Sequence, residues 1–304
     1  MLPVDVHIHT NTSCNLNCKH CYENNGNLPP ASINEELEIA LIRYLSTNFD
    51  ADIHLEGGEI FLEEEKISVL NRLDKSALRR ITITTNGTYR TQKDDVLCVL
   101  RNIAALRISV EGHTGLLHNM LRDGDLQTVL NNAVYYRQND IKVALRITLN
   151  SQNMSGMFSN TIVALEATGV TQFDIYEIQP VGSGKTSKLC IDGLLDVFFN
   201  DWIAAPLNAA VKVALPLRRL KEIGVYKQAL THAGVNIKEV GKCANVSISA
   251  DGAVRICPWD MVSEPLMFVN LKNIEALKEV INAQHMPHEC AYCSRIVMRG
   301  GLKC

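Results

Sequence analysis

The sequence has no apolar run suited to crossing a membrane. Its longest apolar-rich stretch, residues 198–217, is interrupted by two prolines, an aspartate and a lysine, whereas a membrane-spanning helix needs about 20 predominantly apolar residues. The first thirteen residues include Asp5, His7 and His9 in place of a basic start followed by an apolar core, so they do not resemble a signal peptide. We therefore expect a cytoplasmic protein with no membrane partner.

The chain also lacks a strong excess of charge of either sign. Its formal net charge is -3, which is too close to zero to indicate nucleic acid as a partner. Cysteine, by contrast, is plentiful: ten residues lie mostly in close groups. In a reducing compartment such groups indicate metal or cluster binding in preference to disulfides. Cys98 lies in an apolar helical pattern and is expected to be a small core residue.

Six short β-rich runs alternate with amphipathic segments, and steps near thirty residues are typical of right-handed βαβ units. The pattern predicts the α/β class, with a partial (β/α)6 parallel barrel over residues 1–190, a helical linker at 191–240 and a cysteine-bearing tail at 241–304. The first helix is expected to begin with a capping box formed by Ser32 and Glu35. The six predicted strands are Val4–Thr10, Ile53–Glu56, Ile81–Thr85, Arg107–Glu111, Lys142–Asn150 and Phe173–Gln179.

Three cysteines, Cys14, Cys18 and Cys21, directly follow the first predicted strand. Parallel sheets and barrels place their active sites at this carboxyl end. Three thiolates can bind three irons of a [4Fe–4S] cluster, which ordinarily takes four cysteines, so one iron stays open. This Cys-x3-Cys-x2-Cys loop, followed by the aromatic Tyr22, resembles the hallmark of the radical S-adenosylmethionine (SAM) superfamily. A zinc site that combines these cysteines with His20 is the alternative.

The resemblance implies a SAM-binding [4Fe–4S] cluster and S-adenosyl-L-methionine as cofactors. It implies that the open iron chelates the amino and carboxylate groups of the cofactor. It also implies an external one-electron reductant of the flavodoxin or ferredoxin type. Reduction then releases a 5′-deoxyadenosyl radical that abstracts a hydrogen atom from the substrate.

Glycines and a carboxylate close the second predicted strand, in the sequence Gly57-Gly58-Glu59. Glycines let a backbone approach a ligand, and a carboxylate accepts hydrogen bonds from an ammonium group. Placed after the cysteine loop, this motif resembles the glycine-rich motif of the family that holds the cofactor amino group. Ser109 and Glu111 end the fourth strand and resemble the family position that contacts the ribose, although strand-end polarity is the alternative.

Arg122 lies in a segment that resembles one where relatives carry an arginine for the cofactor carboxylate, which a guanidinium binds bidentately. A surface arginine is the alternative. Asn86, Arg146 and Gln179 fall at comparable depth on the same rim of the predicted sheet. They are candidate cofactor-pocket residues, with core or strand-capping roles as the alternative.

The tail carries two further pairs of cysteines. A predicted hairpin that turns at Asp251-Gly252 brings Cys243 and Cys257, the first pair, together. The arrangement resembles the SPASM/twitch extension, which holds auxiliary iron–sulfur clusters. A full SPASM pattern has two more cysteines where this chain has Arg299 and Lys303, so one auxiliary [4Fe–4S] cluster is expected, with a zinc ribbon as the alternative. The four tail cysteines are Cys243, Cys257, Cys290 and Cys293.

A different enzyme class is suggested by His7 and His9, which alternate to one face of a strand. They superficially resemble the opening metal motif of the PHP phosphoesterases. The remaining histidines do not form the further pairs that such a multinuclear site requires. Buried or pocket-lining histidines are the preferred interpretation.

The family resemblance leads to hydrogen-abstracting modification of a peptide or an aminoglycoside-like natural product, by epimerisation or dehydrogenation. Peptide crosslinking is the alternative outcome, and a zinc-binding structural module is the non-enzymatic one. Because the cysteine loop begins at residue 14, we expect no leader-binding winged helix before it. Epimerisation needs a hydrogen donor, for which Cys190 and Cys304 are the candidates.

Overall fold

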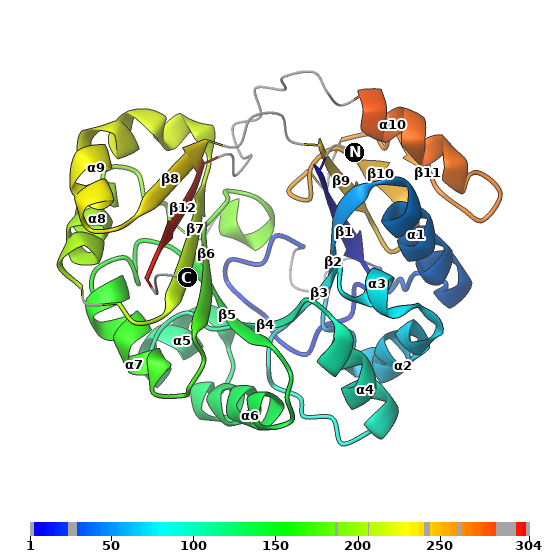
Figure 1. The fold of residues 1–304 in the computed structure, drawn as a ribbon, viewed down its shortest axis with the longest axis horizontal. Helices are drawn as coiled ribbons and strands as arrows, with labels where there is room; N and C mark the ends of the chain where they lie inside the picture. Colours follow the sequence, from blue (N-terminus) through cyan, green and yellow to red (C-terminus); the bar gives the residue numbers. More distant parts are fainter. Residues whose placement is uncertain are drawn as a thin grey trace.

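The computed structural model describes residues 3–23, 29–185, 188–205, 207–239, 244–260, 263–283 and 296–301. Within these residues, twelve strands form one sheet in the order β11-β10-β9-β1-β2-β3-β4-β5-β6-β7-β12-β8. The sheet curls into an open barrel with the helices on its outside (Figure 1). The strands from β9 through β1 to β7 are all parallel to their neighbours, and the outer strands on both sides pair antiparallel.

The strands are β1 (Pro3–His9), β2 (Asp50–Glu56), β3 (Ile81–Thr85), β4 (Ala105–Ser109), β5 (Val143–Leu149), β6 (Gln172–Glu177), β7 (Ala210–Leu215), β8 (Asn236–Glu239), β9 (Ala244–Ile248), β10 (Ala253–Arg255), β11 (Met267–Phe268) and β12 (Ile296–Gly300). The α-helices are α1 (Glu35–Asn48), α2 (Glu64–Ser68), α3 (Lys75–Leu78), α4 (Asp94–Asn102), α5 (Gly115–Arg122), α6 (Leu126–Gln138), α7 (Val163–Glu166), α8 (Leu195–Ala204), α9 (Leu220–His232) and α10 (Leu277–Ala283). Short 3-10 or π segments include Ile60–Glu63, Met157–Ile162 and Gly182–Lys185.

The alternation of residues along the strands separates an apolar outside from a polar inside. On β1, Val4, Val6 and Ile8 are fully buried in the apolar core. Successive side chains of a strand point to opposite faces, so Asp5 and His7 face the interior of the curled sheet. All six predicted strands are present and the predicted α/β partial barrel is confirmed. The helices bury the apolar face, and the interior is left polar.

The sheet extends beyond the six predicted strands on both sides. Segment 191–240, expected as a helical linker, contains α8 and α9 but also β7 and β8. Val211, Val213 and Leu215 alternate as buried residues of β7. From the tail, β9 pairs with β1 and β12 pairs with β7, and the hairpin predicted at residues 251–252 joins β9 to β10.

The apolar-rich stretch at residues 198–217 is divided between α8 and β7. No helix in the described ranges is both long and apolar enough to cross a membrane.

Two local predictions are wrong. The cap of α1 is Asn34, whose side chain accepts hydrogen bonds from the backbone N–H groups of Glu36 (3.0 Å) and Leu37 (3.2 Å). Ser32 is too far upstream to cap this helix and donates to Glu63 Oε2 at 2.7 Å. Cys98 is exposed, because its neighbours in the sequence occupy the buried face of α4.

The assignment of the α1 cap is testable by substitution. Asn34→Ala removes an acceptor for two unpaired backbone donors, so we expect the free energy of unfolding to fall by about 1 kcal/mol. Glu35→Ala, which removes the other half of the expected capping box, should change stability by less than half of that. Urea unfolding of both variants without cofactors measures the difference. An equal loss of stability in Glu35→Ala would contradict this assignment and support the capping box.

Candidate active site

The cysteine loop borders a pocket of about 930 Å³ beyond the carboxyl ends of the central strands. The topology brings residues from most of the parallel strands to this pocket, as expected for such sheets. Eleven of the predicted cluster and cofactor residues line it: Cys14, Cys18, Cys21, Tyr22, Gly57, Gly58, Asn86, Ser109, Arg122, Arg146 and Gln179.

The two glycines after β2 allow the start of the cysteine loop to lie directly on their backbone. A Cβ on Gly58 would lie 2.0 Å from the carbonyl oxygen of Ser13, and Gly57 has a φ of +129°. The contact is hydrogen-bonded: Gly58 N–H donates to Asn11 O (2.9 Å) and Glu59 N–H donates to Ser13 O (2.7 Å). The glycines therefore fix the path of the chain into Cys14 as well as lining the pocket.

The other end of the cysteine loop is held by the segment after β6 and by α5. A Cβ on Gly182 would lie 2.4 Å from the carbonyl oxygens of Cys21 and Tyr22. Ser183 N–H donates to Cys21 O at 2.8 Å, and Lys19 N–H donates to Leu121 O at 2.8 Å. The loop is thus fixed to three separate elements of the sheet and its helices.

Glu111 is fully buried and contacts Arg122 and His20 instead of lining the pocket. Its Oε1 accepts from Arg122 Nε (2.7 Å) and lies 3.2 Å from His20 Nε2, while Oε2 accepts from Thr148 N–H (3.0 Å). Burial alone raises the pKa of Glu111, but His20 and Arg122 lower it to about 2. Arg122, held in this way, places Nη1 3.9 Å from the Sγ of Cys18.

Glu59 is likewise buried away from the pocket. Its carboxylate accepts from Thr85 Oγ1 (2.7 Å), from Asn86 N–H (2.7 Å) and from Phe61 N–H (3.1 Å). The geometry assigns it to joining the end of β2 to the end of β3. Asn86, fixed by this bond, donates to Asn15 Oδ1 of the cysteine loop at 2.8 Å.

The three thiols fit a cluster better than a single ion. Burial raises the pKa of Cys18 to about 11, and the nearby Cys21 and Cys14 thiols act in the same direction against Arg122. In the described part of the chain, no three or more His, Cys, Asp or Glu side chains converge to hold one metal ion. A [4Fe–4S] cluster spreads its thiolate bonds over separate irons, so it does not require that convergence.

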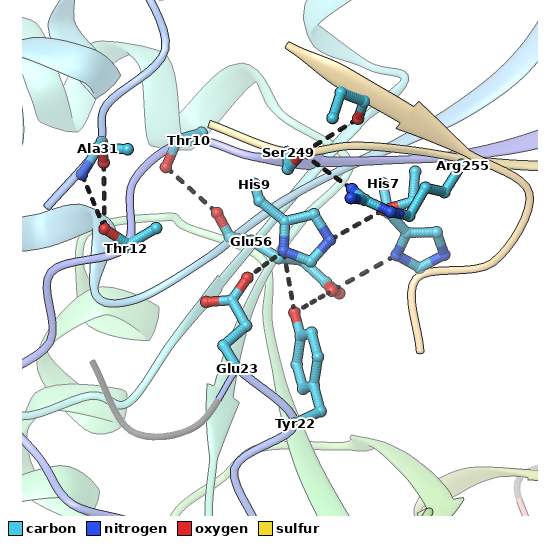
Figure 2. Close-up of polar contacts among 12 residues, drawn as sticks. His7, His9, Thr10, Thr12, Tyr22, Glu23, Ala31, Glu56, Ser249 and Arg255 are labelled. Carbon is cyan, nitrogen blue, oxygen red and sulfur yellow. Dashed lines mark hydrogen bonds and ion pairs between the residues drawn. The ribbon is translucent and has the colours of Figure 1, made fainter. Parts of the chain in front are cut away.

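His7 and His9 lie in a hydrogen-bonded network beside the pocket (Figure 2). His9 is buried between Glu23, which contacts its Nδ1, and Ser247 Oγ, which is 3.2 Å from its Nε2. Burial alone lowers the pKa of His9, but Glu23 raises it above the ordinary value. His7 Nδ1 lies 3.4 Å from Glu56 Oε2. His9 is thus buried and His7 lines a pocket, which fits the interpretation preferred over the PHP motif.

Two buried acceptors in the pocket wall have no hydrogen-bond partner among the described residues. The Gln179 side chain donates from Nε2 to Glu177 O at 3.0 Å, which leaves its buried Oε1 unpaired. The hydroxyl of Thr84 is also buried and unpaired. Buried polar atoms are ordinarily satisfied, so both fit a bound ligand that carries N–H or O–H groups, as the adenosine and ammonium parts of SAM do.

A second pocket, of about 1210 Å³, lies in the polar interior of the curled sheet and adjoins the first. Four residues line both pockets and are here called the passage: Glu56, Arg146, Tyr176 and Trp259. Arg146 Nη1 is 3.4 Å from Glu56 Oε1, and its guanidinium lies 5.1 Å from the centre of the Tyr176 ring. Trp259 meets Tyr22 edge-to-face at 5.1 Å.

Among the four passage residues, only Arg146 was predicted from the sequence as a pocket residue. Residues two apart on a strand share a face, so Thr148, which also lines the first pocket, could have been predicted with it. Glu56 could also have been predicted, because it directly precedes the glycine pair at the end of a strand. Trp259 belongs to the tail, and no sequence signal placed the tail against the cysteine loop.

The cysteines outside the loop are placed as follows. Cys257 lines the second pocket. Cys190 is exposed and contacts Asp192 Oδ2 at 2.8 Å. It lines another pocket, which adjoins the first through Glu177, Ile178 and Gln179. Cys190 itself lines neither the first nor the second pocket. The remaining candidates, Cys243, Cys290, Cys293 and Cys304, lie outside the described residues.

The model of the Radical SAM superfamily matches residues 8–159, half of the chain. The chain belongs to the radical SAM superfamily, which implies a [4Fe–4S] cluster and S-adenosylmethionine. The matched residues include the cysteine loop, Gly57-Gly58 and Arg122, all of which line the first pocket.

Two curated proteins are similar in sequence. One is a probable GTP 3′,8-cyclase from Sulfurisphaera tokodaii, 23% identical over 189 residues that cover 60% of this chain and 58% of that protein. The other is the putative peptide biosynthesis protein YydG from Bacillus subtilis, 24% identical over 193 residues that cover 60% of this chain and 56% of YydG. The chain thus matches under three fifths of the length of each relative.

Solved structures share the fold. SuiB from Streptococcus suis bound to S-adenosylmethionine superposes with a TM-score of 0.65 at 15% identity, covering 96% of this chain and 67% of SuiB. SuiB bound to its precursor peptide SuiA gives a TM-score of 0.59 at 16% identity, over 95% of this chain and 66% of SuiB.

The glycine contact at the cysteine loop yields a mutational test. In Gly58→Ala the new methyl group meets the backbone of Ser13, which cannot rotate away, so we expect the reconstituted protein to lose about four irons per chain. Gly224→Ala on α9, where a Cβ meets nothing within 4 Å, is the matched control and should keep its iron. Iron analysis and circular dichroism check both, and full iron content in Gly58→Ala would contradict the account.

Glu111 gives a prediction for stability against pH. Its pKa is about 2 in the fold against 4.5 ordinarily, so its ionised form stabilises the fold by about 3 kcal/mol above pH 4.5. That contribution is lost as the pH falls from 4.5 towards 2.

Glu111→Gln should therefore be less stable than the wild type by about 3 kcal/mol at pH 7, and the difference should shrink below pH 4.5. Urea unfolding of the cofactor-free protein at several pH values measures it. Glu279→Gln, at an exposed position of α10, is the control and should show a small difference that does not change with pH. A constant difference in Glu111→Gln would refute the assignment.

Proposed function

We propose that this protein reductively cleaves S-adenosylmethionine and uses the 5′-deoxyadenosyl radical to abstract a hydrogen atom from a C–H bond of a peptide, with epimerisation or dehydrogenation as the outcome. The observation that carries the proposal is the pair of adjoining pockets, which share four lining residues. The first holds the cysteine loop and the second offers a polar chamber beyond the passage. One pocket suits the cofactor and the other suits a substrate.

Residues of the first pocket would hold the two cofactors. Cys14, Cys18 and Cys21 would bind the cluster, and Arg122 beside Cys18 would face the cofactor carboxylate. Gln179 Oε1 offers an acceptor to the adenosine end. When bound, the cluster and SAM together supply the radical. The protein then has to exclude water and hold the substrate carbon close to that radical, which is a problem of positioning.

The passage is suited to that positioning. Glu56 is buried, and although burial raises its pKa, Arg146 and His7 hold it well below the ordinary value. It also accepts from Tyr22 Oη at 3.2 Å. A fixed carboxylate and guanidinium side by side can bind both the N–H and C=O groups of a peptide backbone.

The choice of a peptide has support from relatives. YydG is described as a putative peptide biosynthesis protein, and SuiB has been solved with a precursor peptide. YydG resembles this chain in sequence, and SuiB resembles it in fold. The second pocket is lined by carboxylates (Asp5, Asp52 and Glu56) as well as by cations such as Arg107 and Lys212, so the choice of a peptide rests on the relatives and not on the charge of this pocket.

We further propose one auxiliary [4Fe–4S] cluster bound by Cys257 together with Cys243, Cys290 and Cys293. Support comes from Cys257, which lines the second pocket. A cluster there would be available to accept an electron from a substrate radical. An external flavodoxin or ferredoxin would supply the electron that starts each cycle.

The decisive experiment is anaerobic reconstitution. We expect about eight irons per chain, from two [4Fe–4S] clusters, and formation of 5′-deoxyadenosine after addition of dithionite and SAM. Replacing Cys14, Cys18 and Cys21 together by alanine should remove about four irons and all cleavage, while the tail cluster stays. Replacing the exposed Cys98 by alanine is the control. Bound zinc, or no 5′-deoxyadenosine from the wild type, would sink the proposal.

A further inference from the structure

A further pocket, of about 1790 Å³ and here called the third pocket, lies at the end of the strands opposite the cysteine loop, where β6 and β7 begin. It shares Arg107, Lys212 and Val297 with the second pocket, so the two adjoin. Its other charged or amide-bearing side chains are Gln172, Asp174, Asn236, Lys238 and Arg299. Neither the family match nor the cofactor chemistry accounts for these residues.

The third pocket carries an unbalanced positive charge. Its carboxylate, Asp174, is already paired with Arg107 at 2.7 Å. Lys212, Lys238 and Arg299 form no ion pair or hydrogen bond through their side chains in the described part of the chain. Lys212 is also attracted by Asp5 and Asp52, which line the adjoining second pocket. Lys238 and Arg299 face a cavity whose lining, within the described residues, offers no carboxylate besides the paired Asp174.

The strand register makes this arrangement unfavourable in the absence of a ligand. Lys212 of β7 is directly opposite Arg299 of β12 in an antiparallel pair. Like charges at directly opposite positions destabilise a sheet. Lys238 is next to this pair, since β8 aligns its residue 238 with Val297 of β12. A bound anion would remove the repulsion.

Protection of the sheet edge explains only part of the charge. Lysines on edge strands discourage unwanted strand pairing, which accounts for Lys238 on β8, the last strand of the sheet. It does not account for Lys212 and Arg299, because β7 and β12 are each paired on both sides. These two cations thus call for a different explanation.

The edge of β8 indicates the shape of the ligand. Within the described residues, β8 pairs with β12 alone, so its other side presents backbone N–H and C=O groups. In Figure 1 it lies at one end of the curled sheet, beside β12 and β7. An extended peptide can add to such an edge by main-chain hydrogen bonds while side-chain pockets select its residues. Cationic pockets select aspartate and glutamate.

We propose that the third pocket docks an acidic, extended segment of the substrate peptide, remote from the residue that reacts. The inference rests on the proposed function for the identity of the ligand as a substrate peptide. Charge complementarity at Lys212, Lys238 and Arg299 holds the segment, and the adjoining second pocket receives the chain that leads towards the passage. The same charges steer acidic peptides to this mouth in preference to neutral ones.

The test is binding of fluorescein-labelled peptides of about 15 residues to the reconstituted enzyme, followed by anisotropy at low ionic strength. One peptide is rich in Asp and Glu, and its partner carries Asn and Gln at the same positions. We expect the acidic peptide to bind at least about tenfold more tightly, with affinity that falls as salt rises. The variant Lys212→Gln/Arg299→Gln should lose about tenfold.

Lys227→Gln, at an exposed position on the outer helix α9, removes the same charge outside the pocket and should leave the affinity unchanged. Urea unfolding provides a second readout, because Arg299→Gln removes a like-charge pair and should leave the fold as stable as the wild type or more so. Equal binding of the two peptides, equal loss in Lys227→Gln, or equally tight binding of a single-stranded oligonucleotide of matched charge would overturn the docking site.

The two proposals fail in different ways. If the wild type forms 5′-deoxyadenosine but does not distinguish the peptides, the docking site is wrong and the proposed function stands. If the acidic peptide binds through Lys212 and Arg299 but SAM is not cleaved, the cationic pocket stands as a peptide-binding site and the proposed function is wrong.

Discussion

The contact between the Gly57–Gly58 backbone and residues 11–13 is the constraint on which the rest of the site depends. Only a chain without side chains at these positions lets the segment from β1 lie on the end of β2, with Gly58 N–H and Glu59 N–H paired to it. That contact fixes where Cys14 begins the loop. The Glu59 carboxylate in turn accepts a hydrogen bond from Asn86 N–H, and the Asn86 side chain donates to Asn15 of the cysteine loop.

Buried charges set the character of the interior. Glu111 holds Arg122 and His20, Arg107 holds Asp174, and Arg146 lies against Glu56. Replacing a whole buried ion pair by apolar residues is often neutral for stability, because desolvation offsets the attraction, although removal of one partner alone is destabilising. A polar interior of this kind is therefore better explained by binding than by folding, whereas the apolar packing that stabilises the sheet lies on its outer face against the helices.

Much of the fold followed from the sequence because its signals are local. The six strands alternate with helical segments at regular spacing, and the cysteine spacing within residues 14–21, placed directly after the first strand, resembles a cluster-binding loop. The tail did not follow, since pairing of β9 with β1 joins residues about 240 positions apart. The strand β7 was within reach, because buried residues at 211, 213 and 215 alternate, but the flanking prolines and apolar content obscured it.

The candidate site was predictable in position more than in role. Most of the predicted residues line the first pocket, whereas Glu59 and Glu111 are buried beside it against Asn86 and Arg122, and their contact with the cofactor stays a prediction. A sequence does not show whether a carboxylate at a strand end points into a pocket or into the protein. Trp259 was missed for the same reason as β9, since both depend on contacts made across the length of the chain.

The central claim is that the cysteine loop and the strand ends around it form one cofactor pocket that opens through the passage into a substrate chamber. The most direct test is an anaerobic crystal structure of the reconstituted protein with S-adenosylmethionine. The account predicts a cluster on Cys14, Cys18 and Cys21, the methionyl group beside Arg122, and the 5′ carbon facing Glu56 and Arg146. Cofactor bound outside this pocket, or a 5′ carbon turned away from the passage, would contradict it.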